Sequence, residues 1–119
     1  NSSFNPLSVI TQSTLKQLCE NNSTKQIIVK MMEETIDIGN FLNIETKLSI
    51  DKRIEGAKNV GDHKTSTLQD FEKRKPLEID ALIKALIEIG GITKIKTPTL
   101  ETVYLLTKYL AEKNNCFHS

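Results

Sequence analysis

The chain has 119 residues, which is enough for one domain with a modest hydrophobic core. Sixteen Lys and Arg oppose fifteen Asp and Glu, a formal charge of +1, so the charge balance does not favour a nucleic acid or an anionic membrane as a partner. No apolar run reaches the roughly 18 residues of a membrane span, and the N-terminal segment lacks the pattern of a signal peptide, so we expect a soluble protein.

The two cysteines, Cys19 and Cys116, are too few for a disulfide framework, and neither has a Cys or His partner at the spacing of a metal site. We therefore expect free thiols in a reducing cytoplasm, and no metal. The chain begins at Asn1 without an initiator methionine, within a pattern of polar and apolar residues typical of a helix. We interpret it as a fragment or processed part of a longer protein.

Apolar residues recur at three- and four-residue steps in the first half of the chain, which predicts amphipathic helices. The first helix covers about residues 7–18, and Asn21-Asn22-Ser23 forms a turn that can cap the next. The second helix runs from Thr24 to about Asn43. A third, weaker pattern covers 45–60 and stops near Gly61, a residue type that commonly follows a helix C-terminus.

Helix signals in the second half of the chain come from caps and prolines. Ser66 and Gln69 have the spacing of a capping box, which predicts a short helix beginning at Ser66. Pro76 is favoured at the first position of the next helix, whose first turn would contain Glu78. That helix is apolar on nearly every side until Gly90-Gly91, so we expect it at the buried centre of the molecule.

A last helix opens at Thr97-Pro98, and its expected inner side consists of Leu100, Val103, Tyr104, Leu106 and Leu110. Nowhere does the sequence alternate apolar and polar residues with the period of a strand. The sequence therefore predicts an all-α domain, a bundle of about six helices.

Two asparagines near the N-terminus form the first candidate site. Asn1 and Asn5 are four residues apart and would share one helix face, so their carboxamides can both point at a ligand with donors and acceptors, such as a hydroxy or oxo carboxylate. From the spacing alone, two surface residues with Asn5 as a cap before Pro6 are the simpler interpretation.

Ser66 and Glu78 form the second candidate site. Ser66 can donate to a carboxylate from a helix start, and Glu78 can accept from a hydroxyl, a ribose or an ammonium group. The simpler interpretation is that each stabilises its own helix. His63 precedes Ser66 by three residues, and a lone histidine there is more often a surface residue than a ligand, so we assign it no chemistry.

Four segments together resemble the C-terminal domain of ketopantoate reductases (2-dehydropantoate 2-reductases). They are Asn1-Ser2-Ser3-Phe4-Asn5-Pro6-Leu7, Ser66-Thr67-Leu68-Gln69-Asp70, Glu78-Ile79-Asp80 and Thr97-Pro98-Thr99-Leu100-Glu101. Their order and spacing match across nearly the whole chain, whereas residues 20–60 match only as a helical pattern. The resemblance implies that residues 1–119 are a substrate-binding helical domain like that of 6-phosphogluconate dehydrogenase.

The resemblance also implies the function. Family members are oxidoreductases in which a separate N-terminal Rossmann domain holds NADPH, and they reduce ketopantoate to pantoate for pantothenate and coenzyme A biosynthesis. The Rossmann domain and the general-acid lysine, one helical turn before Asn1, would lie outside this chain, so the fragment alone should be inactive. The partners implied are a 2-oxo acid, the Rossmann domain and, in a homodimer, a second copy of the protein.

The family's site residues can be placed on this sequence one by one. Asn1 and Asn5 match the asparagines that bind the substrate, and Ser66 matches the serine that holds its carboxylate. Glu78 matches a glutamate that contacts cofactor and substrate and supports the catalytic lysine. Two alternatives stay open: a reductase of a different 2-oxo acid, and a helical binding or dimerisation module.

Overall fold

The computed structural model describes residues 4–43, 49–73 and 80–113, and these ranges contain seven α-helices and no strand. The helices are α1 (Phe4–Thr11), α2 (Leu15–Glu20), α3 (Asn22–Phe41), α4 (Ile50–Val60), α5 (Ser66–Glu72), α6 (Asp80–Thr93) and α7 (Pro98–Lys113). The all-α prediction is confirmed.

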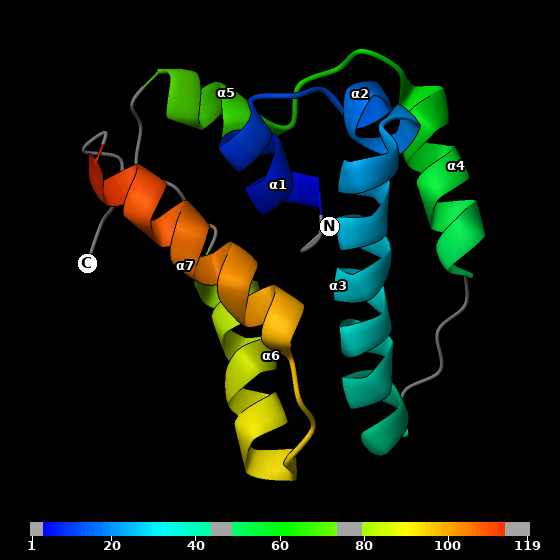
Figure 1. Cartoon of the computed structure of the whole chain (residues 1–119), viewed down its shortest axis with the longest axis vertical. Helices are drawn as coiled ribbons and strands as arrows, with labels where there is room; N and C mark the ends of the chain where they lie inside the picture. The colour runs from blue at the N-terminus through cyan, green and yellow to red at the C-terminus, as the bar shows by residue number, and fades with distance from the viewer. Residues whose placement is uncertain (1–3, 44–48, 74–79, 114–119) are drawn as a thin grey trace.

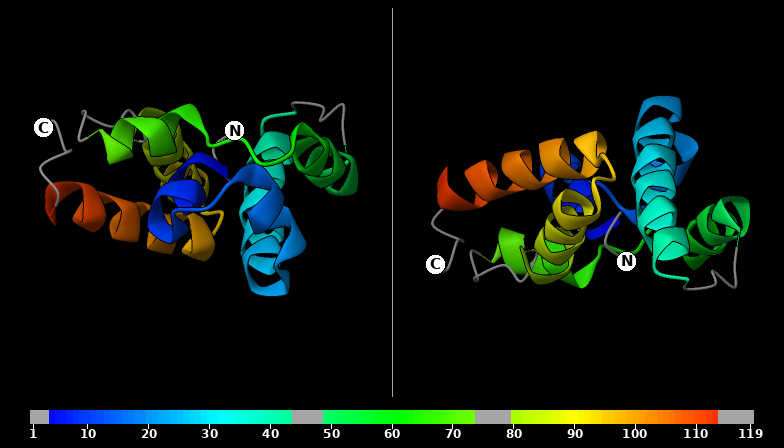
Figure 2. Two further views of the ribbon diagram at one scale, coloured as in Figure 1. Left: turned by 90° about the horizontal axis from the view of Figure 1, so that it is seen from above. Right: turned by 90° about the horizontal axis from the view of Figure 1, so that it is seen from below.

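The helices form two groups with α1 between them (Figure 1). On one side α2 packs against α3 and α4, and on the other α6 packs against α7, while α1 contacts α2, α5 and α7. The views from above and from below show the same two groups (Figure 2). Helix α3 also touches α6 and α7, so it joins the two groups directly.

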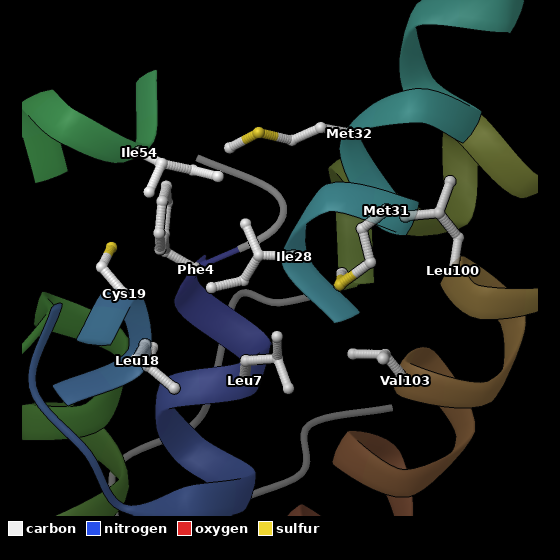
Figure 3. Close-up of a cluster of buried hydrophobic side chains, with 10 residues drawn as sticks. All are labelled: Phe4, Leu7, Leu18, Cys19, Ile28, Met31, Met32, Ile54, Leu100 and Val103. Atoms are coloured by element: carbon white, nitrogen blue, oxygen red, sulfur yellow. The ribbon is translucent and has the colours of Figure 1, made fainter. Parts of the chain in front are cut away.

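The main hydrophobic core lies where these groups meet. Figure 3 shows side chains from five helices converging there, namely Phe4, Leu7, Leu18, Cys19, Ile28, Met31, Met32, Ile54, Leu100 and Val103. Burial of a side chain such as Leu7 or Ile28 contributes roughly 1.5–3 kcal/mol. Helix α1 is buried at five of its eight positions, Phe4, Pro6, Leu7, Ser8 and Val9, and is therefore the central element.

The prediction that the apolar helix before Thr97 would be the buried centre is wrong. Among residues 83–93 of α6 only Ile83 and Gly90 are buried, and Ile92 is 83% exposed. In the described part of the chain, the extensive contacts of α6 are with α3 and α7, and the exposed Ile92 marks a side that faces outward. Apolar content indicates how much surface a helix can bury, but the number of neighbouring helices decides how much it does bury.

The predicted first helix is two helices. Helix α1 ends at Thr11, and Gln12 has a φ of 51°, which a continuous helix does not allow. Thr14 then caps α2, because its hydroxyl accepts from the Gln17 N–H while the Gln17 side chain accepts from the Thr14 N–H. This capping box was missed because the apolar spacing of Leu15 and Leu18 continues that of α1.

The other predicted boundaries are mostly close to those observed. The Asn21 side chain caps α3 as expected, Gly61 follows α4, and Pro98 opens α7. Helix α6, however, continues through Gly90-Gly91 to Thr93. The inner side predicted for α7 is right for Leu100 and Val103 and wrong for Leu106, which is 50% exposed. The start predicted at Pro76 lies outside the described residues.

Candidate functional site

The structure describes two of the four predicted site residues. Asn5 is half-buried in the first turn of α1, which begins at Phe4, so it lies within the helix and does not cap it. Ser66 is the first residue of α5. Asn1 and Glu78 lie outside the described residues, and so does any contact that would join them to Asn5 or Ser66.

Thr65, and not Ser66, caps α5. The Thr65 backbone is extended, and its Oγ1 accepts from the Leu68 N–H at 3.0 Å. The Gln69 side chain donates to the Lys64 carbonyl oxygen at 3.1 Å instead of completing a capping box. Both Thr and Ser are good caps, and the Gln69 spacing favoured the wrong one. Capping therefore gives no reason for a serine at position 66.

A pair of buried hydroxyl groups links α1 to the start of α5. Ser8 Oγ lies 2.6 Å from Thr65 Oγ1 and 2.7 Å from the Asn5 carbonyl oxygen. Ser8 is fully buried and Thr65 is 9% exposed. The contact places the backbone of Asn5 within two hydrogen bonds of Thr65, the residue directly before Ser66. The structure thus brings the regions around two predicted site residues together.

The proton positions in this link follow from its acceptors. A carbonyl oxygen only accepts, so the single Ser8 proton goes to the Asn5 carbonyl. Ser8 Oγ must then accept from the Thr65 hydroxyl, and Thr65 Oγ1 in turn accepts from the Leu68 N–H. We define Asn5, Ser8, Thr65 and Leu68 as the hydroxyl link; both of its hydroxyl groups and the Leu68 N–H each donate to one acceptor. Sequence reasoning missed Ser8, although a serine between Leu7 and Val9 on a buried helix was a signal.

One ion pair joins Lys64, before the start of α5, to Glu72 at its end. Lys64 Nζ lies 2.8 Å from Glu72 Oε2, and both side chains are partly exposed. Such an exposed pair contributes little, about 0–1 kcal/mol. His63 is exposed, and its carbonyl oxygen accepts from the Leu15 N–H at 3.2 Å, so its backbone helps to hold the start of α2.

The described residues offer little other chemistry. Burial raises the pKa of the Cys19 thiol, and the charges of Lys25 and Lys58 oppose this only in part. The thiol therefore stays protonated at neutral pH, which does not suit a nucleophile. Within the described ranges no three His, Cys, Asp or Glu side chains gather as they would around a metal ion. In the same ranges, no helix has the length and apolar character needed to cross a bilayer.

The fold places the chain in the class of helical domains found in reductases. It is similar to a putative ketopantoate reductase from Ralstonia solanacearum, with a TM-score of 0.91 and 30% identity, over 98% of this chain and 35% of that one. A dimeric ketopantoate reductase from Staphylococcus aureus has a TM-score of 0.75 at 15% identity, over 96% of this chain and 40% of that one, and shows the fold alone.

The family follows from the sequence comparisons. Residues 1–111 match the family described as "Ketopantoate reductase PanE/ApbA C terminal". The chain is 42% identical over 117 residues to a 2-dehydropantoate 2-reductase of Mesorhizobium japonicum, a match that covers 98% of this chain and 36% of the relative. The chain belongs to the ketopantoate reductase C-terminal domain family, as its resemblance indicated, and it spans about a third of the length of that relative.

Proposed function

We propose that this chain is the substrate-binding helical domain of an NADPH-dependent 2-dehydropantoate 2-reductase, which converts ketopantoate to pantoate on the route to pantothenate and coenzyme A. The observation that carries the proposal is the family match over residues 1–111. The 42% identity to a curated reductase of that name supports the same reaction. We place the enzyme in the cytoplasm.

Each proposed site residue has a role that suits its chemistry. Asn1 and Asn5 offer amide donors and acceptors to the oxygens of the substrate, and Ser66 donates a hydrogen bond to its carboxylate. Glu78, outside the described residues, contacts cofactor and substrate and supports the catalytic lysine of the full-length protein. NADPH, held mainly by a Rossmann domain outside this chain, supplies the hydride.

The proposal is tested with purified full-length protein, NADPH and ketopantoate. We expect turnover, and we expect Ser66→Ala to raise KM for ketopantoate about 10- to 100-fold, because hydrogen bonds to charged groups contribute about 1.5–3 kcal/mol. Asn5→Ala should lower kcat/KM similarly. Glu78→Ala should reduce turnover far more than stability, since an acid in a first helical turn adds only about 0.3–1 kcal/mol to stability.

Two exposed residues on α3 provide matched controls. Ser23→Ala and Asn40→Ala remove the same side-chain groups at exposed positions and should leave KM and kcat unchanged. The function would be refuted if the wild-type protein failed to oxidise NADPH with every 2-oxo acid of a panel that includes ketopantoate. Turnover of another 2-oxo acid in place of ketopantoate would refute only the substrate, and faster turnover with NADH would refute only the cofactor.

We also propose that the protein forms a homodimer. Leu105, Leu106 and Tyr109 on α7 are 62%, 50% and 62% exposed and lie on the side of the helix opposite its buried residues. Exposed apolar groups of this kind are typical of contact surfaces. The S. aureus enzyme with this fold is dimeric, which supports a second copy as the partner.

A further inference from the structure

The hydroxyl link between α1 and α5 costs more than an apolar contact would. Burying a hydroxyl is unfavourable unless it is hydrogen-bonded, and an alanine beside a valine would fill a similar volume without that requirement. Ser8 has no exposed surface, and its neighbours on α1 are buried apolar residues. Two polar groups at this position therefore call for a reason other than stability.

The link restricts the position of α1 relative to α5. An apolar contact tolerates small shifts, whereas hydrogen bonds of 2.6 and 2.7 Å that share one hydroxyl fix both the distance and the direction. One end of the link is the backbone of Asn5, and the other is the cap directly before Ser66. The backbone of Asn5 and the residue before Ser66 are thus joined by the same few atoms.

We propose that Ser8 and Thr65 are positioning residues, whose hydroxyl pair sets the separation between Asn5 and Ser66 and so matches the site to its 2-oxo acid. The inference rests on the proposed function. Neither hydroxyl needs to touch the substrate. A misplacement of about 1 Å at a binding group can cost about 100-fold in rate, so loss of the link should affect catalysis strongly.

The test uses the full-length enzyme with Ser8→Ala, Thr65→Val and Thr65→Ser. Ser8→Ala leaves Thr65 able to cap α5, so it removes the link alone. We expect Ser8→Ala and Thr65→Val each to raise KM for ketopantoate about tenfold, because each misplaces the groups that bind it. The KM for NADPH should stay within about twofold of wild type, since the link lies beside the 2-oxo acid. Thr65→Ser keeps the hydroxyl, so its KM for ketopantoate should lie within about twofold of the wild-type value.

Two further measurements separate positioning from stability. Thr107→Val removes another buried hydroxyl, which donates to the Val103 carbonyl oxygen at 2.7 Å, and should lower stability without changing KM. The double variant Ser8→Ala/Thr65→Val should have a KM close to that of the weaker-binding single variant, because both changes break one link. Denaturant unfolding of every variant measures its free energy of unfolding independently of KM.

Three results would overturn the inference while leaving the proposed function intact. One is an active wild type whose Ser8→Ala and Thr65→Val variants keep their KM for ketopantoate. A second is an equal rise in KM in Thr107→Val, and a third is a failure of Thr65→Ser to restore KM. A wild type inactive with every 2-oxo acid would instead refute the function, and the inference with it.

Discussion

Glu34 shows how a single side chain can hold two distant helices together. Its carboxylate, 9% exposed, accepts from the backbone N–H groups of Thr99 and Leu100 at the start of α7, both at 2.9 Å. These N–H groups have no partner within their own helix, and the N-terminal end of the helix dipole favours a negative charge. Glu34 therefore acts as a cap supplied by α3.

Replacing Glu34 should destabilise the protein. We expect Glu34→Ala to lower the free energy of unfolding by about 1–3 kcal/mol, because it leaves two N–H groups in a largely buried setting without an acceptor. Glu34→Gln keeps one acceptor oxygen, so its free energy of unfolding should lie between those of the wild type and Glu34→Ala. The control is Glu33→Ala, which changes the exposed residue directly before Glu34 on α3. Urea unfolding followed by circular dichroism measures all three, and equal losses for Glu33→Ala and Glu34→Ala would contradict the capping role.

At the scale of elements, the end of α6 explains the first of its two adjacent glycines. The helix closes with a Schellman arrangement, in which the Ile95 N–H donates to the Gly90 carbonyl oxygen at 2.9 Å and Lys94 has a φ of 62°. A Cβ on Gly90 would lie 2.8 Å from the Ile95 carbonyl oxygen, whereas a Cβ on Gly91 would meet nothing within 4 Å. Gly90 thus allows the chain to fold back closely.

Alanine at these two positions should have opposite effects. Gly91→Ala should stabilise the protein by about 0.5–1 kcal/mol, because glycine is unfavourable within a helix. Gly90→Ala should destabilise it, since overpacking against a backbone atom costs about 1–3 kcal/mol and outweighs that gain. Thermal unfolding of the two variants checks the contrast. If both variants changed stability by the same amount in the same direction, the close approach of the Ile95 carbonyl oxygen would not make a Cβ at Gly90 costly.

The helices that sequence reasoning placed well are those with local signals. Asn21, Gly61 and Pro98 each mark a boundary through their own chemistry, and the structure confirms all three. Thr65 was missed because Ser66 is an equally good cap next to it. Spacing alone did not decide whether Asn5 and Ser66 form a site, and only the family resemblance favoured that view.

At the scale of the whole molecule, the arrangement depends on contacts that no local pattern contains. Helix α1 became the centre because α2, α5 and α7 pack around it, although it has only eight residues and α6, with fourteen, is about as apolar. Glu34 and Leu100 meet across 66 positions of sequence, as do Ser8 and Thr65 across 57. Glu34 did carry a signal, since an acid stood at the inner-face spacing between Met31 and Ile38.

The assembly of the whole protein provides the last test. If a second copy covers the exposed side of α7, full-length protein should sediment as a dimer, and Leu105→Glu should weaken the dimer at least about tenfold, because a charge is costly to bury without a partner. Ile92→Glu places the same charge on an exposed apolar position of α6, the neighbouring helix, and should leave the dimer intact. A monomeric wild type, or equal dissociation by both variants, would show that something other than this surface sets the oligomeric state.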